Sequence, residues 1–220
     1  ERIRQSALTA AKHHTLLAGP RGIGKSHLTS LVYHRIRKLQ ELQDGLLIGW
    51  LAEEEWSITS FLDFLLCVLR ALQEESRKTG QPSPDISGVE SFYEQPADAA
   101  PKAAQLLKEF IGNRTLLLLV ENFDELLAGL GKEEQKQLRG FLDESSCMVL
   151  ATAQSVFKSV KKGRSPFFDF FQQEQLEELN VDDARELLAK IANYKGNREL
   201  ELFIKNGKGR DRFSAVHHLA

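Results

Sequence analysis

The sequence is poor in cysteine and has no apolar run long enough to cross a bilayer. Its two cysteines, Cys67 and Cys147, each lie inside an apolar run, which favours reduced core residues over a disulfide framework. A membrane-spanning helix needs about 20 consecutive apolar residues, and no signal peptide opens the chain. The formal net charge is -2, which gives the chain as a whole no attraction to nucleic acid or to a membrane surface. These absences favour a cytoplasmic protein that makes no contact with a membrane.

One glycine-rich stretch near the N-terminus fits the phosphate-binding pattern G-x-x-x-x-G-K-[ST] at every specified position. It consists of Gly19, Pro20, Arg21, Gly22, Ile23, Gly24, Lys25 and Ser26, with His27 directly after it. The apolar run 15–18 before it suits a buried strand, and residues 27–39 show helical spacing. Glycines let successive N–H groups turn inward around phosphate oxygens, and a helix N-terminus adds partial positive charge. The stretch therefore predicts a P-loop; the alternative is a glycine-rich turn that happens to precede a helix.

A second apolar run, residues 116–120, ends abruptly in Glu121. This pattern is typical of a central parallel strand that delivers a carboxylate to a nucleotide site. In that interpretation Lys25 binds the β- and γ-phosphates of a nucleotide, while Ser26 and Glu121 hold Mg²⁺ from opposite sides. The alternative is a buried strand followed by a helix whose first acids merely complement the helix dipole.

Two further segments carry polar groups whose interpretation the sequence leaves open. The apolar run 147–151 leads into Thr152 and Gln154, which either hydrogen-bond a γ-phosphate or the attacking water, or simply end a strand. Residues 158–164 hold the densest positive charge in the chain. One interpretation is that this segment contacts nucleic acid, and another is that Arg164 reaches a neighbouring subunit's nucleotide. An exposed basic loop without a functional role fits the pattern as well as both together.

Apolar runs and helical periodicities alternate along most of the chain. The predicted strands are 15–18, 46–52, 116–120, 147–151 and 175–179. Ser57 or Thr59 is expected to cap the apolar helix that starts at Phe61. The pattern predicts an α/β domain with a mainly parallel sheet.

The division of the chain is also visible in its composition. Residues 80–101 contain four of the six prolines and predict a loop or mobile insertion, with a helix following over 102–111. After residue 180 only helical patterns occur. The sequence therefore predicts a core over residues 1–180 and a partial α-helical lid over residues 181–220.

These features resemble the AAA+ and STAND branch of the P-loop ATPases, and within it the origin-initiator and archaeal-type ATPases. The resemblance covers nearly the whole chain, although only residues 19–26 are highly specific. It implies an α/β fold, the P-loop NTPase three-layer sandwich, with a parallel sheet in the order 5-1-4-3-2. It also implies ATP and Mg²⁺ as ligands, and a chain that starts without methionine then looks like an ATPase-domain fragment.

The resemblance assigns roles to particular residues. Lys25 and Ser26 would form the Walker A pair, and Glu121 would be the Walker B acid. Sensor 1 would be Thr152 or Gln154. The arginine finger would be Arg164.

The chain departs from the family at the residue after the Walker B acid. Members commonly carry a second acid there, whereas this chain has Asn122. An amide cannot take a proton from the attacking water, and general base catalysis contributes roughly a hundred- to ten-thousandfold in rate. Hydrolysis is therefore expected to be slow unless Asp124 or Glu125 takes over the role.

Three hypotheses for the function follow. The first is an ATP-binding and ATP-hydrolysing motor or switch module that acts through homo-oligomerisation or a partner protein. The second is a nucleotide-occupied regulatory scaffold with negligible hydrolysis, and the third is a small-molecule kinase, whose P-loop would look the same. No guanine-reading Asn-Lys-x-Asp stretch is present, and nucleic acid remains an open partner for the basic segment.

Overall fold

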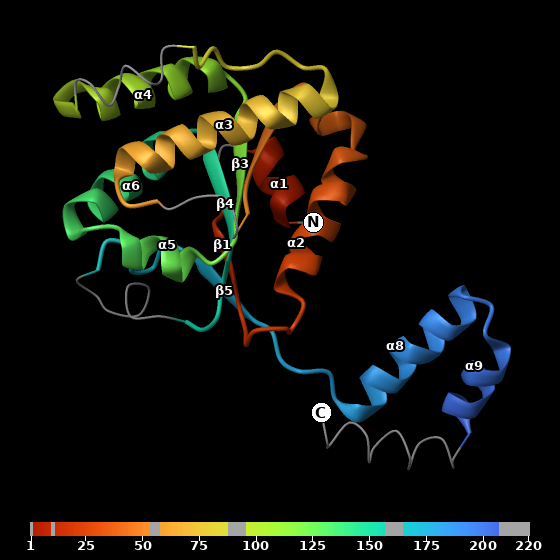
Figure 1. The fold of residues 1–220 in the computed structure, drawn as a ribbon. Helices are drawn as coiled ribbons and strands as arrows, with labels where there is room; N and C mark the ends of the chain where they lie inside the picture. The colour runs from red at the N-terminus through yellow and green to blue at the C-terminus, as the bar shows by residue number, and fades with distance from the viewer. Residues whose placement is uncertain (1, 10–11, 53–57, 88–95, 157–164, 207–220) are drawn as a thin grey trace. The chain divides into compact units, whose positions relative to one another are not determined.

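The computed structural model of the chain describes residues 2–9, 12–52, 58–87, 96–156 and 165–206. The chain divides into two compact units, Glu1–Leu176 and Glu177–Ala220. The first unit contains the whole sheet, and the described part of the second contains helices alone (Figure 1). The boundary therefore falls after Leu176, whereas the sequence placed the end of the core at residue 180.

Five parallel strands form the sheet of the first unit, in the order β2-β3-β4-β1-β5. They are β1 Thr15–Ala18, β2 Leu46–Leu51, β3 Thr115–Val120, β4 Cys147–Ala153 and β5 Gln172–Gln175. This is the predicted order 5-1-4-3-2 read from the other edge, so the predicted α/β P-loop NTPase fold is confirmed. Because parallel strands end at the same edge of a sheet, the segments that follow β1, β3 and β4 meet there.

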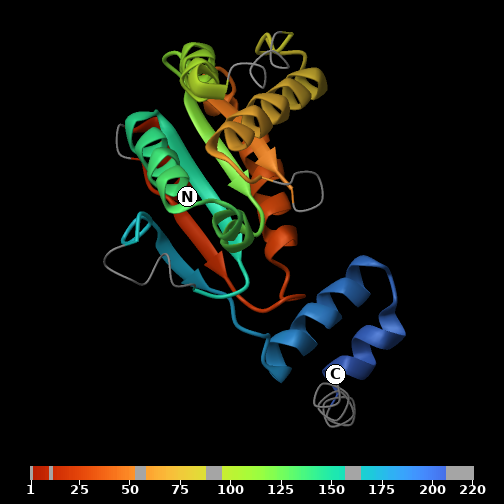
Figure 2. The same ribbon diagram turned by 60° about the vertical axis from the view of Figure 1, so that its left-hand side comes forward.

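Helices cover both faces of this sheet, which makes a sandwich of three layers (Figures 1 and 2). On one face lie α1 Arg2–Leu8, α2 Lys25–Arg37 and the short 3₁₀ helix η1 Gln40–Leu42. On the other face lie α3 Phe61–Thr79, α4 Pro96–Ile111, α5 Phe123–Gly129 and α6 Lys132–Glu144. Strand β3 packs against the helices on both faces of the sheet, because alternate side chains of its apolar run point to opposite faces. Leu117 and Leu119 face α2, whereas Leu116 and Leu118 face α3.

The predicted loop over residues 80–101 is wrong at its C-terminal end, because α4 already begins at Pro96. Proline is tolerated in the first helical turn, where its missing N–H has no helical partner to lose. Pro101 lies inside the helix, and packing outweighs its cost. Buried side chains recur at every fourth position of α4 and anchor it to the core, namely Ala99, Ala103, Leu107 and Ile111.

Two other element boundaries differ from the sequence prediction. Helix α3 is capped by Ser60, whose Oγ accepts a hydrogen bond from Asp63 N at 3.1 Å, and not by Thr59. Ser57, the other predicted cap, lies outside the described residues. Strand β5 lies at residues 172–175, earlier than the predicted 175–179. Its four residues are all polar, and its pairing with β1 at the edge of the sheet defines it. No apolar pattern marks such a strand.

The prediction of reduced core cysteines is confirmed. Cys67 and Cys147 are buried free thiols. Burial raises the pKa of the Cys67 thiol to about 12 and raises that of Cys147 as well. Both side chains therefore act as small apolar core residues and not as nucleophiles.

The described part of the second unit consists of α8 Val181–Tyr194 and α9 Arg198–Lys205. Asn180 caps α8, with its side chain accepting a hydrogen bond from Asp183 N at 2.9 Å. The two helices contact each other, and Ala192 and Ile204 are buried. None of the described helices of the chain combines the length and the apolar character needed to span a membrane.

Candidate functional site

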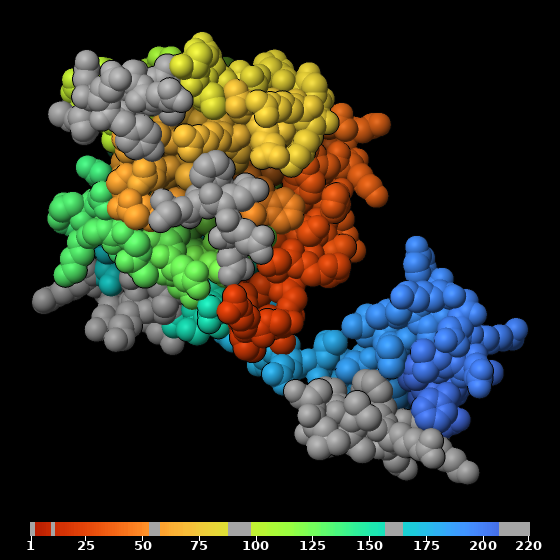
Figure 3. Space-filling view, viewed as in Figure 1, coloured from red at the N-terminus to blue at the C-terminus, as the bar shows by residue number. Residues whose placement is uncertain are grey.

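The segment between β1 and α2 forms a backbone cradle at the carboxyl edge of the sheet. Gly22 and Gly24 have φ values of 84° and 97°, in the left-handed region that glycine adopts at no steric cost. Gly24 is the residue before α2, so the unpaired N–H groups of the helix N-terminus follow it directly. In Figure 3 this segment, in red, lies at the surface of the first unit.

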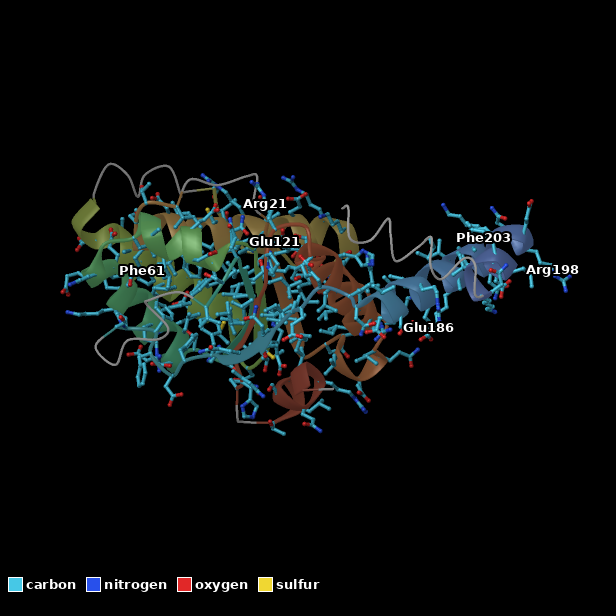
Figure 4. All side chains as sticks on the ribbon, turned by 90° about the horizontal axis from the view of Figure 1, so that it is seen from below. Arg21, Phe61, Glu121, Glu186, Arg198 and Phe203 are labelled. Atoms are coloured by element: carbon cyan, nitrogen blue, oxygen red, sulfur yellow. The ribbon has the colours of Figure 1, made fainter. Side chains whose placement is uncertain are left out.

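A cavity of about 230 Å³ opens at this cradle. Its lining residues are Arg21, Gly22, Gly24, Lys25, Ser26, His27, Asn122 and Gln154. Figure 4 labels Arg21 of the loop and Glu121 of the strand end beside it. The lining thus joins segments that follow three different strands, and all but two of its residues come from the loop and the first turn of α2.

Lys25 is the buried cation of the site, with only 8% of its surface exposed. Its Nζ donates hydrogen bonds to the backbone carbonyls of Gly19, at 2.8 Å, and Pro20, at 2.9 Å. The ammonium is therefore folded back onto the loop that it belongs to. A buried ammonium whose partners are neutral carbonyls is well placed to attract an anion.

Glu121 and Ser26, 95 positions apart in the sequence, are in direct contact. Ser26 Oγ donates a hydrogen bond to Glu121 Oε2 at 2.8 Å. The other carboxylate oxygen, Oε1, accepts a hydrogen bond from Trp50 Nε1 at 3.1 Å. Glu121 is fixed at the end of β3 by its own N–H, which donates to Leu51 O on β2 at 3.0 Å. The structure therefore brings together the two residues that the sequence assigned to Mg²⁺.

The residues after Glu121 turn towards the end of β4. Asn122 has φ 50°, also left-handed, and its N–H donates to Thr152 Oγ1 at 3.1 Å. Asp124 Oδ2 accepts a hydrogen bond from Gln154 N at 3.0 Å, and Glu125 Oε1 accepts one from Gln154 Nε2 at 3.3 Å. Asp124 Oδ1 is buried and has no hydrogen-bond partner among the described residues.

These contacts separate the predicted sensor residues. Gln154 lines the cavity at the P-loop. Thr152 has only 1% of its surface exposed, and its hydroxyl oxygen accepts the hydrogen bond from Asn122 N. Gln154 is thus the residue of β4's carboxyl end that faces the cradle. Arg164 and the rest of the basic segment 158–164 lie outside the described residues.

Sequence reasoning missed Trp50. It lies inside the predicted strand 46–52, and its residue type carries no signal for a carboxylate partner. Only the register of β2 against β3, in which Trp50 is opposite Leu119, places the indole beside Glu121.

No protein-family model matches the sequence, and no curated protein matches it either. Solved structures do resemble the chain. The ORC2 protein of Aeropyrum pernix in its ADP form is 17% identical, with a TM-score of 0.60 over 98% of this chain and 58% of that one. A Walker-type ATPase of Pyrococcus abyssi is 15% identical, with a TM-score of 0.56 over 93% of this chain and 60% of that one.

A third similar structure is the ORC1 protein of Aeropyrum pernix in complex with DNA, which is 13% identical, with a TM-score of 0.55 over 87% of this chain and 46% of that one. The chain spans less than two thirds of the length of each of these structures. At these identities the likeness establishes the fold, which is that of the α/β P-loop NTPases. Within that class it resembles the AAA+ ATPases of the origin-initiator type.

Proposed function

We propose that the chain is an ATP-binding and ATP-hydrolysing AAA+ module that works as a motor or a switch. The observation that carries this proposal is the 2.8 Å contact between Ser26 Oγ and Glu121 Oε2, which joins the end of the P-loop to the end of β3. The similar ORC2 protein of Aeropyrum pernix is known in an ADP form and in ADPNP–ADP complexes. Adenine nucleotides are therefore the first ligands to test.

The pair of oxygens at Ser26 and Glu121 fits Mg²⁺. This ion prefers oxygen ligands, and in nucleotide sites it is held by one or two protein groups together with phosphate oxygens and water. A hydroxyl and a carboxylate already in contact provide two such groups on one side of the cradle. When bound, Mg²⁺ neutralises charge on the phosphates.

Lys25 and the cradle would bind the triphosphate. The Lys25 ammonium now donates to two loop carbonyls, and phosphate oxygens would replace these neutral acceptors with charged ones. The N–H groups at the start of α2 would add donors that have no helical partner. Gln154, which lines the cavity, would orient the reacting end of the nucleotide.

The general base has to be an acid other than the residue after Glu121, because Asn122 cannot take a proton. We assign this role to Asp124. Its Oδ2 is tied to the backbone of Gln154, a residue of the cavity, and its Oδ1 accepts no hydrogen bond among the described residues. Turnover is expected to be slow, since this base is not the residue directly after Glu121, where related ATPases commonly carry their second acid.

The proposal is tested by single-turnover hydrolysis of ATP with the intact protein. Lys25→Ala should abolish binding of Mg·ATP, and Glu121→Gln should slow phosphate release by about a hundredfold or more. Asp124→Asn should slow release without weakening binding. Glu133→Gln is the matched control, because Glu133 is exposed on α6 and pairs only with Lys136 among the described residues. If calorimetry detects no uptake of Mg·ATP by the wild type, the proposal fails.

One observation favours a second candidate function, a regulatory scaffold that keeps a nucleotide bound with negligible hydrolysis. The residue that lines the cavity after Glu121 is an amide, Asn122. In this case the wild type would bind Mg·ATP and release no phosphate in any oligomeric form. Asp124→Asn would then change nothing in a single-turnover assay, which separates the two candidates.

The action of the module would depend on assembly with further copies or with a partner protein. The nucleotide would then control association, as in other switches in which a bound γ-phosphate orders a surface. The helices of the second unit would form part of a lid. Light scattering of the intact protein with Mg·ATP and with Mg·ADP tests this, and equal masses in both states at all protein concentrations would argue against nucleotide-controlled self-assembly.

A further inference from the structure

Each oxygen of the Glu121 carboxylate receives one hydrogen bond, and the two donors come from different elements. Ser26 on α2 binds Oε2, and Trp50 on β2 binds Oε1. The proposed function uses the first of these contacts. The second one fixes the rotation of the carboxylate, because a group held at both oxygens cannot turn about its terminal bond without breaking a hydrogen bond.

The indole reaches Glu121 because of the sheet register. Trp50 lies opposite Leu119, and side chains alternate along both strands, so Trp50, Leu119 and Glu121 all project to the face that α2 covers. A slip of one residue would turn Trp50 to the α3 face and remove the contact. The placement of Trp50 is therefore as well determined as the pairing of β2 with β3.

Neighbouring side chains hold the indole ring in place. The Tyr33 ring packs on Trp50 with centroids 5.4 Å apart and an angle of 49° between the planes. The Tyr33 hydroxyl donates to the Glu75 carboxylate at 3.1 Å, and Glu75 also pairs with Arg37. Since α2 and α3 cover opposite faces of the sheet, this contact between them passes around the outer edge of β2 and restricts the movement of Trp50.

The chemistry of the indole suits a positioning role. An indole N–H only donates hydrogen bonds, so it keeps one carboxylate oxygen occupied and leaves the other to face Ser26. Replacing a group that orients a metal ligand in this way typically lowers metal affinity or activity by roughly 10- to 100-fold.

We infer that Trp50 is a positioning residue that holds the Glu121 carboxylate in the orientation needed for Mg²⁺ at the nucleotide site. This inference rests on the proposed function for its consequence, but the contact itself can be tested without nucleotide.

The first experiment tests the contact in the intact protein without ligand. The chain contains two tryptophans, so Trp56→Phe assigns the indole N–H resonance of Trp50 in a nitrogen-correlated NMR spectrum. Glu121→Ala should shift this resonance clearly, because it removes the acceptor of the indole hydrogen bond. Glu133→Gln should leave the resonance in place. A resonance that does not respond to Glu121→Ala overturns the inference.

The second experiment tests the consequence by calorimetry with ATP, in Mg²⁺ and in excess chelator. Trp50→Phe removes the N–H and keeps an aromatic ring. It should weaken binding about tenfold in Mg²⁺ and leave binding in chelator unchanged. Glu133→Gln, at an exposed position of α6, should bind as the wild type does in both conditions.

The outcomes separate the inference from the function on which it rests. Wild-type affinity of Trp50→Phe in Mg²⁺ overturns the inference, and so does an equal loss in both conditions, which would indicate a structural role. If the wild type binds no ATP in either condition, the proposed function fails, while the NMR experiment still decides whether Trp50 holds Glu121.

Discussion

At the scale of single residues, Asn122 combines a backbone role with a place in the cavity. Its φ of 50° lies in the left-handed region, which asparagine and glycine enter more easily than other residues. Its N–H donates a hydrogen bond to Thr152, and the residue also lines the P-loop cavity. The structural and the chemical contributions of this residue can therefore be separated by substitution.

We expect Asn122→Ala to lower the free energy of unfolding by about 1 kcal/mol, because alanine is strained at this φ. Asn122→Gly should cost clearly less, since glycine adopts the conformation freely. If the amide plays no part in hydrolysis, both variants keep the single-turnover rate of the wild type. Urea denaturation and phosphate release measure the two effects. Equal destabilisation by alanine and glycine would contradict the strain argument.

His14 makes stability depend on pH. Burial lowers the pKa of its imidazole to about 4, from an ordinary value of 6.5, and the nearby Asp143 only partly opposes this. The ring stacks on Phe170 with centroids 3.9 Å apart. Between these two pH values the unfolded chain therefore binds a proton that the folded chain does not. The stabilisation present above pH 6.5 is lost progressively as the pH falls towards 4.

The expected loss is about 2 kcal/mol, allowing for the partial exposure of the ring. His14→Gln should remove this part of the pH dependence, whatever its effect on stability at neutral pH. Urea denaturation of the two proteins at several pH values measures it. His34→Gln, at an exposed position of α2, is the control. A pH dependence that His14→Gln leaves unchanged would show that other groups cause it.

At the scale of elements, α3 shows how a local contact sets a helix boundary. Ser60 Oγ accepts from Asp63 N, and Asp63 Oδ2 in turn accepts from Thr59 N at 3.2 Å. The first bond satisfies a free N–H group in the first turn of a helix that carries much of the core, and the second ties that turn to the residue before the cap.

Ser60→Ala should lower the free energy of unfolding by about 1 kcal/mol, because it leaves a helix N–H without its acceptor. Ser60→Asp should restore most of the loss. Thr59→Ala, which removes an exposed hydroxyl bound to the same aspartate, should cost less. Chemical denaturation ranks the three variants. A larger loss for Thr59→Ala than for Ser60→Ala would reassign the cap to Thr59.

At the scale of the whole molecule, nucleotide binding should appear as added stability. A ligand that binds only the folded state, present at a concentration of about 100 times its dissociation constant, stabilises that state by about 2.7 kcal/mol. For a chain of this size that corresponds to a rise in Tm of about 5–10 °C. Calorimetry of the intact protein with Mg·ATP measures the rise. Lys25→Ala should show none, and an equal rise in that variant would place the binding elsewhere.

Sequence and structure agree best where apolar runs are long and buried on both sides. The β3 run and the strand before the P-loop were predicted within one residue of their observed starts, because a central parallel strand needs apolar side chains on both faces. The polar edge strand β5 was misplaced because only its pairing with β1 defines it. The start of the proline-containing helix α4 was misplaced because packing on the core defines that helix.

By itself, the sequence determined the cradle and the acid at the end of β3, because a glycine pattern and an abrupt change from leucine to glutamate are local signals. The tertiary structure alone decided which groups meet them. It paired Glu121 with both Ser26 and Trp50, turned Gln154 but not Thr152 towards the cradle, and bound Asp124 to the end of β4. These contacts depend on strand order and register, and a single residue of register changes the face on which a side chain lies.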